Sequence, residues 1–250
     1  MLDEPKTLYA HLRELRNRLA MVSLCFAACF AGCYHFSSDI QYLLMKPLQP
    51  LFDQGRSMVY TSLPEAFLSE INTSLFASFL LTFPFLLMQI WLFSRPGLFK
   101  IERQILRVVM ICIPGLFYLG VMFAHTVVLP RAFEFFINFE HGAVPLYFLP
   151  KISDYINFVQ RLMFVFGIGF ELPILLFTLV SFGMLSLQSL KSKWRIVVFL
   201  LCALSAVITP PDALSMVALA VPMIVLYGVT IIVIQWTQYK IKNNTDSYHA

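Results

Sequence analysis

Charged residues are scarce in this sequence: only 13% of the 250 residues are Asp, Glu, Lys or Arg, whereas 59% are hydrophobic. Soluble domains contain about 25% charged residues, so the shortage excludes an ordinary water-soluble domain. The net charge of +4 is small, and its cations follow the ends of apolar runs, so we do not expect nucleic-acid binding. The composition is typical of a protein that crosses a lipid bilayer several times.

Motifs that carry catalysis are missing as well. The sequence has no phosphate-binding loop, no His or carboxylate pair at metal-ligand spacing and no Ser-His-Asp set. Its five cysteines form no Cys-x-x-Cys pair. Cys25, Cys29 and Cys33 fall four residues apart, and a helix–helix contact explains them better than a metal or redox stripe, because no His or carboxylate accompanies them. We predict no enzyme, no metal site and no cofactor.

Six apolar runs dominate what is present. They are continuous rather than alternating, and each is long or nearly long enough to cross a bilayer as a helix. We therefore predict an all-α integral membrane protein with a single membrane domain over residues 1–250. We expect no cleavable signal peptide, because the first run lacks a small-residue cleavage site. The predicted spans are 19–36, 71–93, 106–129, 162–183, 196–208 and 213–234.

Lys and Arg gather on one side of these spans, which predicts the orientation. Cytoplasmic segments of membrane proteins carry an excess of Lys and Arg, so both termini are expected on the cytoplasmic side or its organellar equivalent. An even number of spans agrees with that. The cations of this side are Lys6, Arg13, Arg16, Arg18, Arg95, Lys100, Arg103, Arg107, Lys191, Lys193, Arg195, Lys240 and Lys242.

Residues 1–18 and 235–250 flank the spans. Leu8, Leu12, Leu15 and Leu19 repeat at spacings of four, three and four, which predicts an amphipathic helix on the cytoplasmic side. Its basic face would suit a membrane-surface anchor. We expect residues 235–250 to form a polar cytoplasmic tail.

The last two spans are short. Residues 196–208 cover about 20 Å as a helix, against a hydrocarbon core of about 30 Å. The sequence Thr209-Pro210-Pro211-Asp212 predicts a tight turn after them, and Pro222 is expected to break the following helix. We hypothesise that this hairpin locally thins the membrane.

Glu171 is the clearest polar signal inside an apolar run. A carboxyl group there costs a few kcal/mol at least, so it is expected to face protein or a water-filled cavity. Pro173 removes the helical partner of the Gly169 carbonyl, which adds open backbone beside the carboxyl. The alternative is a protonated Glu171 bonded to a neighbouring helix. Gln89 is a weaker polar candidate and could simply bond another helix.

A charged island follows the second run. Pro96 and Gly97 are expected to end one helix and the charges after them to open the next. A single carboxylate, Glu102, stands among the cations of this island. We interpret the loop as part of a recognition site.

Four motifs stand in order along the six runs: His11-Leu12-x-Glu14-Leu15-Arg16-x-Arg18-Leu19, Gln89-Ile90-Trp91-x-Phe93-x-x-Pro96-x-Leu98-x-Lys100-x-Glu102-Arg103, Phe166-Gly167-x-x-Phe170-Glu171-x-Pro173 and Thr209-Pro210-Pro211-Asp212. Together they resemble the TatC family, the receptor subunit of the twin-arginine protein translocase. The resemblance covers essentially the whole chain.

The resemblance implies a receptor for folded precursor proteins that carry an Arg-Arg signal peptide. It implies small single-span TatA- and TatB-like partners, an oligomeric receptor complex, use of the proton-motive force, and a bacterial cytoplasmic (inner) or mitochondrial inner membrane. Two guanidinium groups call for two carboxylates, and Glu14 and Glu102 are the candidates. The residues implied for signal-peptide binding are Glu14, Arg16, Phe93, Pro96, Leu98, Lys100, Glu102 and Arg103.

The resemblance also gives roles to residues away from the charged island. Glu171 would meet the transmembrane helix of a small partner, with Gln89 and Thr209 as further polar candidates. Pro47 and Asp212 match structural positions of the outer side.

Three alternatives stay open. Glu14 could pair only with Arg18 while Glu102 caps a helix. The chain could be a small-solute or proton-coupled transporter or channel subunit with Glu171 as its ion site, although we find no inverted repeat. It could also be a purely structural assembly protein, which would leave Glu14 and Glu102 unexplained.

Overall fold

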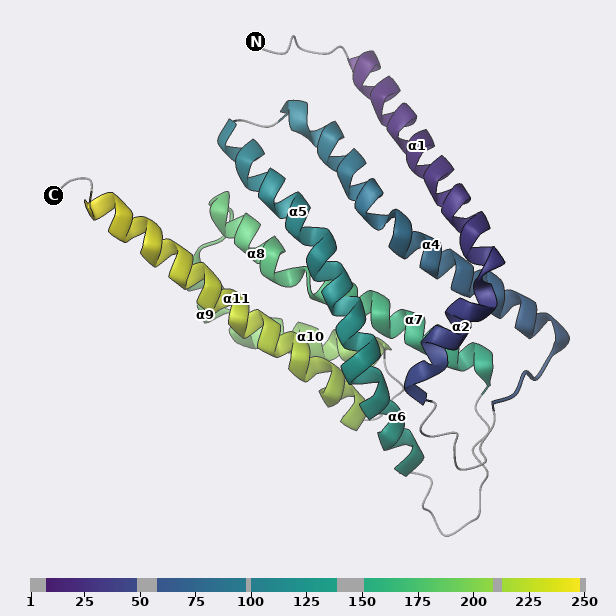
Figure 1. Ribbon diagram of the computed structural model, residues 1–250. Coiled ribbons are helices and arrows are strands. Elements are labelled where there is room, and N and C mark those ends of the chain that lie inside the picture. The colour runs from purple at the N-terminus through teal and green to yellow at the C-terminus, as the bar shows by residue number, and fades with distance from the viewer. Residues whose placement is uncertain (1–7, 49–57, 98–99, 139–150, 209–212, 248–250) are drawn as a thin grey trace. The chain divides into compact units, whose positions relative to one another are not determined.

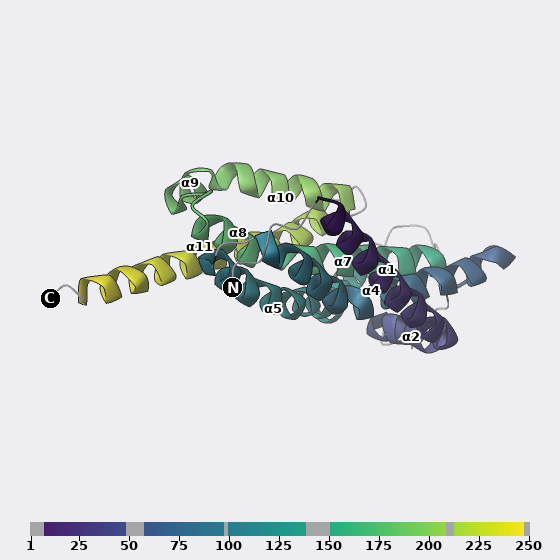
Figure 2. The same ribbon diagram turned by 90° about the horizontal axis from the view of Figure 1, so that it is seen from above.

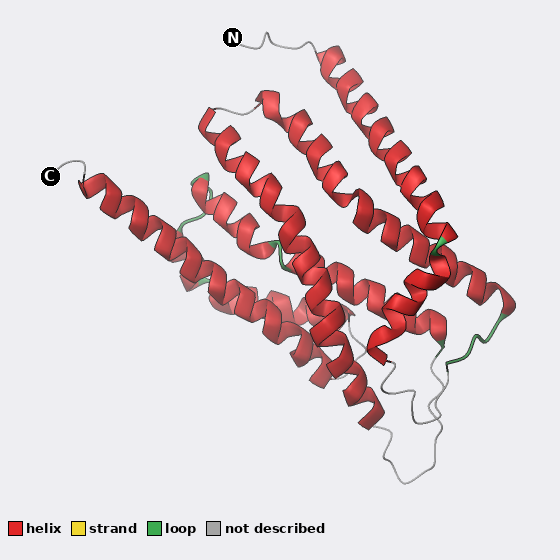
Figure 3. Ribbon diagram, in the orientation of Figure 1, coloured by secondary structure: helices red, strands yellow, loops and turns green. Residues whose placement is uncertain are grey.

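A computed structural model describes residues 8–48, 58–97, 100–138, 151–208 and 213–247. These residues form helices almost throughout (Figure 3), and the described ranges contain no strand beyond one isolated bridge between Val59 and Lys151. Four helices are long and apolar enough to cross a membrane, and residues 194–206 and 220–236 form two shorter apolar helices. The predicted all-α membrane fold with two short final helices is confirmed.

The chain divides into two compact units. The first comprises residues 1–110 and 129–161, and the second comprises residues 111–128 and 162–250. The first unit holds α1 (Leu8–His35), α2 (Ser37–Met45), η1 (Lys46–Leu48), α4 (Leu63–Ser94), η2 (Arg95–Gly97), the start of α5 (Lys100–Phe123), α6 (Leu129–Asn138) and the first half of α7 (Ile152–Gly169). The second holds the rest of α5 and α7, the π-helical turn η3 (Ala124–Val128), α8 (Leu172–Ser181), α9 (Leu187–Ser192), α10 (Trp194–Ile208) and α11 (Ala213–Ser247).

Helices α1 and α4 pack side by side in the first unit (Figures 1 and 2). Helix α1 runs without a break, so the predicted amphipathic segment and the predicted first span are one continuous helix. Its leucine stripe points away from the protein: Leu12, Leu15 and Leu19 are 59%, 43% and 64% exposed. That apolar surface is therefore available to lipid or to another chain.

Helix α4 begins at Leu63 rather than at the predicted Ile71. The cause is local, because Glu65 in the first turn accepts hydrogen bonds from the backbone N–H groups of Thr61 (2.6 Å) and Ser62 (3.2 Å). Such a carboxylate satisfies donors that the start of a helix leaves unpaired. Pro64 also suits the first turn, where its missing N–H costs nothing. Polar residues thus extend the helix beyond its apolar run.

The outer connections of the first unit are tied together by hydrogen bonds. The buried Tyr155 hydroxyl of α7 donates to the Leu44 carbonyl of α2 at 2.6 Å. The Ser153 hydroxyl donates to Glu65 of α4. Pro47 lies in η1, directly after α2, and η1 contacts α6. Pro47 is thus part of an ordered outer cluster, while its predicted structural role stays a prediction.

Close helix contacts hold the second unit. A Cβ atom at Gly120 of α5 would collide with the Phe166 carbonyl oxygen of α7, and one at Gly167 would lie 2.6 Å from the Phe117 ring. Phe123 packs against Phe166, with ring centroids 5.8 Å apart. Small residues let helices in lipid approach this closely. Elsewhere in this unit, α9 and α10 lie along α11 (Figure 2).

Three helix ends test the predictions further. Helix α4 ends at Ser94, the turn η2 covers Arg95–Gly97, and α5 begins at Lys100, so the predicted break is confirmed. Helix α10 has 15 residues, about 22 Å, and is short as predicted. The predicted break at Pro222 is wrong, because α11 runs through it to Ser247. A proline removes one backbone hydrogen bond, and neighbouring groups in a membrane protein can compensate for it.

Candidate functional site

The candidate site lies where the cytoplasmic half of α1 meets the end of α4. We call this set of residues the α1–α4 contact: His11, Glu14 and Arg18 from α1, and Gln89 and Phe93 from α4. Spacings of three and four put the α1 residues on one face of the helix, and a spacing of four does the same for the α4 pair. The two faces oppose each other, so a short stretch of each helix supplies the whole set.

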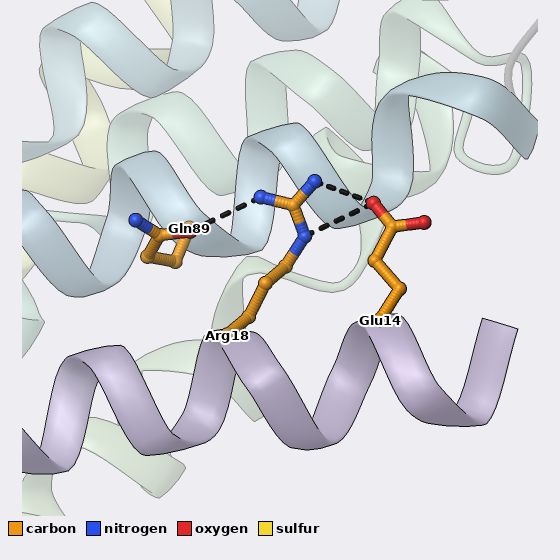
Figure 4. Close-up of polar contacts among 3 residues, drawn as sticks. All are labelled: Glu14, Arg18 and Gln89. Carbon is orange, nitrogen blue, oxygen red and sulfur yellow. Dashed lines mark hydrogen bonds and ion pairs between the residues drawn. The ribbon is translucent and has the colours of Figure 1, made fainter. Parts of the chain in front are cut away.

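Arg18 connects both sides of the α1–α4 contact (Figure 4). Its Nε and Nη2 atoms donate to Glu14 Oε1, with an Nε–Oε1 distance of 3.1 Å. Its Nη1 atom donates to Gln89 Oε1 at 3.1 Å. The side chains of Arg18 and Glu14 are 18% and 19% exposed. Partial burial reduces solvent screening, so this ion pair is stronger than an ordinary surface pair.

An aromatic pair continues the contact toward the end of α4. The rings of His11 and Phe93 stack with centroids 4.2 Å apart and planes inclined by 19°. This fixes Phe93 one helical turn from the level of Glu14. Pro96 follows in the exposed turn η2. The structure thus brings two predicted site residues, Glu14 and Phe93, to the same helix pair.

A shallow groove of about 440 Å³ opens beside the Glu14–Arg18 ion pair. It therefore offers a route by which a ligand could reach the carboxylate. Its lining residues are Tyr9, Ala10, Arg13, Glu14, Asn17, Arg18 and Met21.

Other predicted residues of the recognition surface lie elsewhere or cannot be described. Arg16 is exposed on α1, outside the α1–α4 contact. Arg103 lies in α5, and its Nε atom is buried with no hydrogen-bond partner among the described residues. Lys100 and Glu102 belong to the first turn of α5, but their side chains lie outside the described part of the chain. The pairing of Glu14 with Glu102 stays a prediction. Leu98, Thr209 and Asp212 lie outside the described residues.

Glu171 belongs to the second unit and occupies a break in a predicted span. Helix α7 ends at Gly169, and α8 begins at Leu172 with Glu171 as its N-terminal cap and Pro173 in its first turn. The sequence predicted one continuous span over 162–183, whereas the structure interrupts it here, because the proline cannot donate a backbone hydrogen bond. Both carboxyl oxygens of Glu171 are buried, and neither has a hydrogen-bond partner among the described residues. A buried carboxyl without a hydrogen bond is costly, so Glu171 is a candidate polar site.

Sequence reasoning missed the link between Arg18 and Gln89. The spacing between Glu14 and Arg18 predicts an ion pair, and that ion pair is present. The contact of Arg18 with Gln89 joins residues 71 positions apart, for which one sequence holds no local signal. The sequence groups Gln89 with Glu171 as an intramembrane candidate, whereas in the structure Gln89 bonds Arg18 in the cytoplasmic half of α1.

The fold and these sites first define a class: an integral, all-α, multi-pass membrane protein in which a guanidinium–carboxylate ion pair within one helix also contacts a neighbouring helix. Comparison with known proteins then gives the family. The model of the Sec-independent protein translocase protein (TatC) family matches residues 10–222. The chain belongs to the TatC family.

Individual relatives agree with this assignment. The chain is 38% identical over 226 residues to the TatC protein of Rickettsia prowazekii, covering 89% of this chain and 90% of that protein. It is 32% identical over 228 residues to that of Escherichia coli K12, covering 91% and 88%. A crystal structure of the twin-arginine translocase receptor TatC superposes with a TM-score of 0.78 at 28% identity, covering 91% of this chain and 99% of that one.

The family assignment decides what class of protein the chain is, while the roles of Glu14 and Glu102 stay predictions. The predicted resemblance is confirmed, and a translocase family agrees with the prediction that the chain is not an enzyme. Nothing in the comparisons supports a small-solute transporter. The chain is thus a Sec-independent protein translocase subunit.

Proposed function

We propose that this chain is the signal-peptide receptor of a twin-arginine translocase and that Glu14 binds an arginine of the signal peptide. The observation that carries the proposal is the contact of Glu14 with a guanidinium group, that of Arg18. A carboxylate that holds one guanidinium has the geometry to hold another. The groove beside it supplies access, and Phe93 supplies an apolar surface for the neighbouring part of the peptide.

Glu102 is proposed as the second carboxylate. The signal carries two adjacent arginines, and each guanidinium is best satisfied by its own carboxylate. Glu102 lies in the first turn of α5, which follows η2 in the chain. Lys100 and Arg103 flank it in sequence and would keep it ionised without a ligand. Arg16, Pro96 and Leu98 complete the proposed surface.

The proposed transport step needs partners. We infer small single-span TatA- and TatB-like proteins, assembled with this chain into an oligomeric complex that uses the proton-motive force. The support is Glu171, a buried carboxyl without a described partner in a membrane-embedded helix break. A polar side chain on a partner helix would satisfy it, because lipid offers no hydrogen bonds. Thr209 is a further candidate for that contact.

Charge reversal at Glu102 tests the receptor function. Membranes carrying the complete translocase are titrated with fluorescent Arg-Arg and Lys-Lys signal peptides. We expect Glu102→Lys to abolish the preference for Arg-Arg, since a cation then opposes the guanidinium group. The control is Glu134→Lys, which reverses an exposed carboxylate of α6 outside the proposed surface. Unchanged binding by Glu102→Lys, or an equal loss for both peptides, would contradict a specific carboxylate–guanidinium contact.

A further inference from the structure

We propose that Arg18 is an internal competitor for Glu14, and that an arginine of the signal peptide binds by displacing Arg18 from that carboxylate. This rests on the proposed function and assigns a role in setting ligand affinity to Arg18, which lines the groove beside Glu14. Arg18 occupies the carboxylate until a better guanidinium donor arrives through the groove.

The hydrogen-bond pattern makes Arg18 a replaceable partner. Both of its bonds to Glu14 end on the same oxygen, Oε1. The strongest guanidinium–carboxylate contact is a fork in which two parallel N–H groups each reach a different oxygen. A peptide arginine entering beside the ion pair can form that fork. The ligand therefore gains more from Glu14 than Arg18 loses.

Gln89 gives Arg18 a place to remain after the exchange. Its buried side-chain oxygen accepts from Nη1 of Arg18, on the side of the guanidinium away from Glu14. A neutral amide is a weaker acceptor than a carboxylate, so Gln89 does not draw Arg18 off Glu14 in the absence of ligand. When a ligand arrives, Arg18 keeps one anchored bond. The exchange replaces one cation by another and leaves the carboxylate neutralised throughout.

The competition sets the affinity that a ligand must exceed. Either ligand must displace the same two hydrogen bonds of Arg18, so the cost of displacement is equal for arginine and lysine. A lysine ammonium group is a point donor that cannot form the two-oxygen fork, so only an arginine recovers that cost. Arg18 therefore lowers both affinities by the same factor and brings a lysine ligand below useful binding first.

Removing the competitor is the first test, with fluorescent Arg-Arg and Lys-Lys peptides titrated against the detergent-solubilised complete translocase. We expect Arg18→Gln to strengthen binding of both peptides by the same factor, about tenfold, the order expected for losing a charge-assisted hydrogen bond from the competition. Glu14→Gln, as the matched variant, should weaken both peptides.

Two substitutions at Gln89 keep Arg18 and should act in opposite directions. Gln89→Glu offers Arg18 a second carboxylate, so it should release Glu14 and raise Arg-Arg affinity as Arg18→Gln does. Gln89→Leu removes the second acceptor, so Arg18 should hold Glu14 harder and Arg-Arg affinity should fall. These two Gln89 variants test the competitor role of Arg18 even if the Arg18→Gln protein does not fold.

The outcomes separate this inference from the proposed function. Weaker or unchanged binding of both peptides by Arg18→Gln would overturn the competitor role, as would equal effects of the two Gln89 substitutions. The receptor function would still stand if Glu14→Gln loses the Arg-Arg preference. Wild-type protein that does not prefer Arg-Arg would contradict both.

Discussion

Two carboxyl groups that are buried or half-buried, those of Glu14 and Glu171, differ in their hydrogen-bond partners. Glu14 has a guanidinium partner in the same helix, at the spacing that favours such pairs. Glu171 is buried in a helix break without a described hydrogen-bond partner. Both residues were predicted from the sequence: Glu171 because a charge inside an apolar run is costly, and Glu14 because it stands in a motif that resembles the family and could bind a guanidinium group. The Arg18–Gln89 contact was not identified, because it depends on how two distant segments pack.

Glu171 is the residue at which a partner contact is easiest to test. Glu171→Gln keeps a polar group of the same shape, so cross-linking to the transmembrane helix of a small partner should be largely retained. Glu171→Leu removes the hydrogen bond and should lose the cross-link. The measurement is the yield of disulfide cross-links between cysteines introduced near residue 171 and along the partner helix. Equal yields for the two variants would rule the contact out.

Gly120 is the residue at which a single methyl group should matter most. A Cβ atom there meets the backbone carbonyl of Phe166, which cannot move as a flexible side chain would. We expect Gly120→Ala to destabilise the protein by about 2 kcal/mol, as overpacking typically does. Gly115→Ala is the control in the same helix, because its Cβ meets nothing within 4 Å. Thermal unfolding in detergent should separate the two, and identical midpoints would mean that the α5–α7 contact relaxes freely.

At the scale of helices, the sequence predicted well which segments are helical but predicted the helix boundaries poorly. Apolar runs predicted the membrane helices because lipid leaves backbone groups no partner except each other. Helix ends depend on polar contacts instead. Glu65 extends α4 to Leu63 through bonds to Thr61 and Ser62, and α11 continues through Pro222 because one missing bond is not enough to break a long apolar helix.

The short helix α10 gives a prediction at this scale. Its 15 residues span about 22 Å, less than the hydrocarbon thickness of about 30 Å. If this helix thins the membrane locally, inserting one apolar turn into it should abolish transport while membrane insertion stays intact. The same residues added after Ala250 are the control. Transport by the lengthened protein at the wild-type rate would refute the role of local thinning.

The whole molecule combines charged segments near the ends of its apolar runs with a largely apolar exterior. The cations that predict its orientation fall in segments that six spans put on one side of the membrane. The exposed leucines of α1 add an apolar surface in the cytoplasmic half of that helix. These features suit a receptor that receives a peptide from the cytoplasm beside the bilayer. Composition and charge predicted this arrangement, whereas the identity of the ligand came from the motifs that the chain shares with its family.

The central claim is that Glu14 contacts an arginine of the signal peptide. A double-mutant cycle measures this contact, with wild-type and Glu14→Gln translocase each titrated with a signal peptide and with versions in which either arginine is replaced by Gln. We predict a coupling energy of about 1.5 kcal/mol or more between Glu14 and one of the two arginines, as for a charge-assisted hydrogen bond. Additive effects for both arginines, with no coupling, would contradict the account.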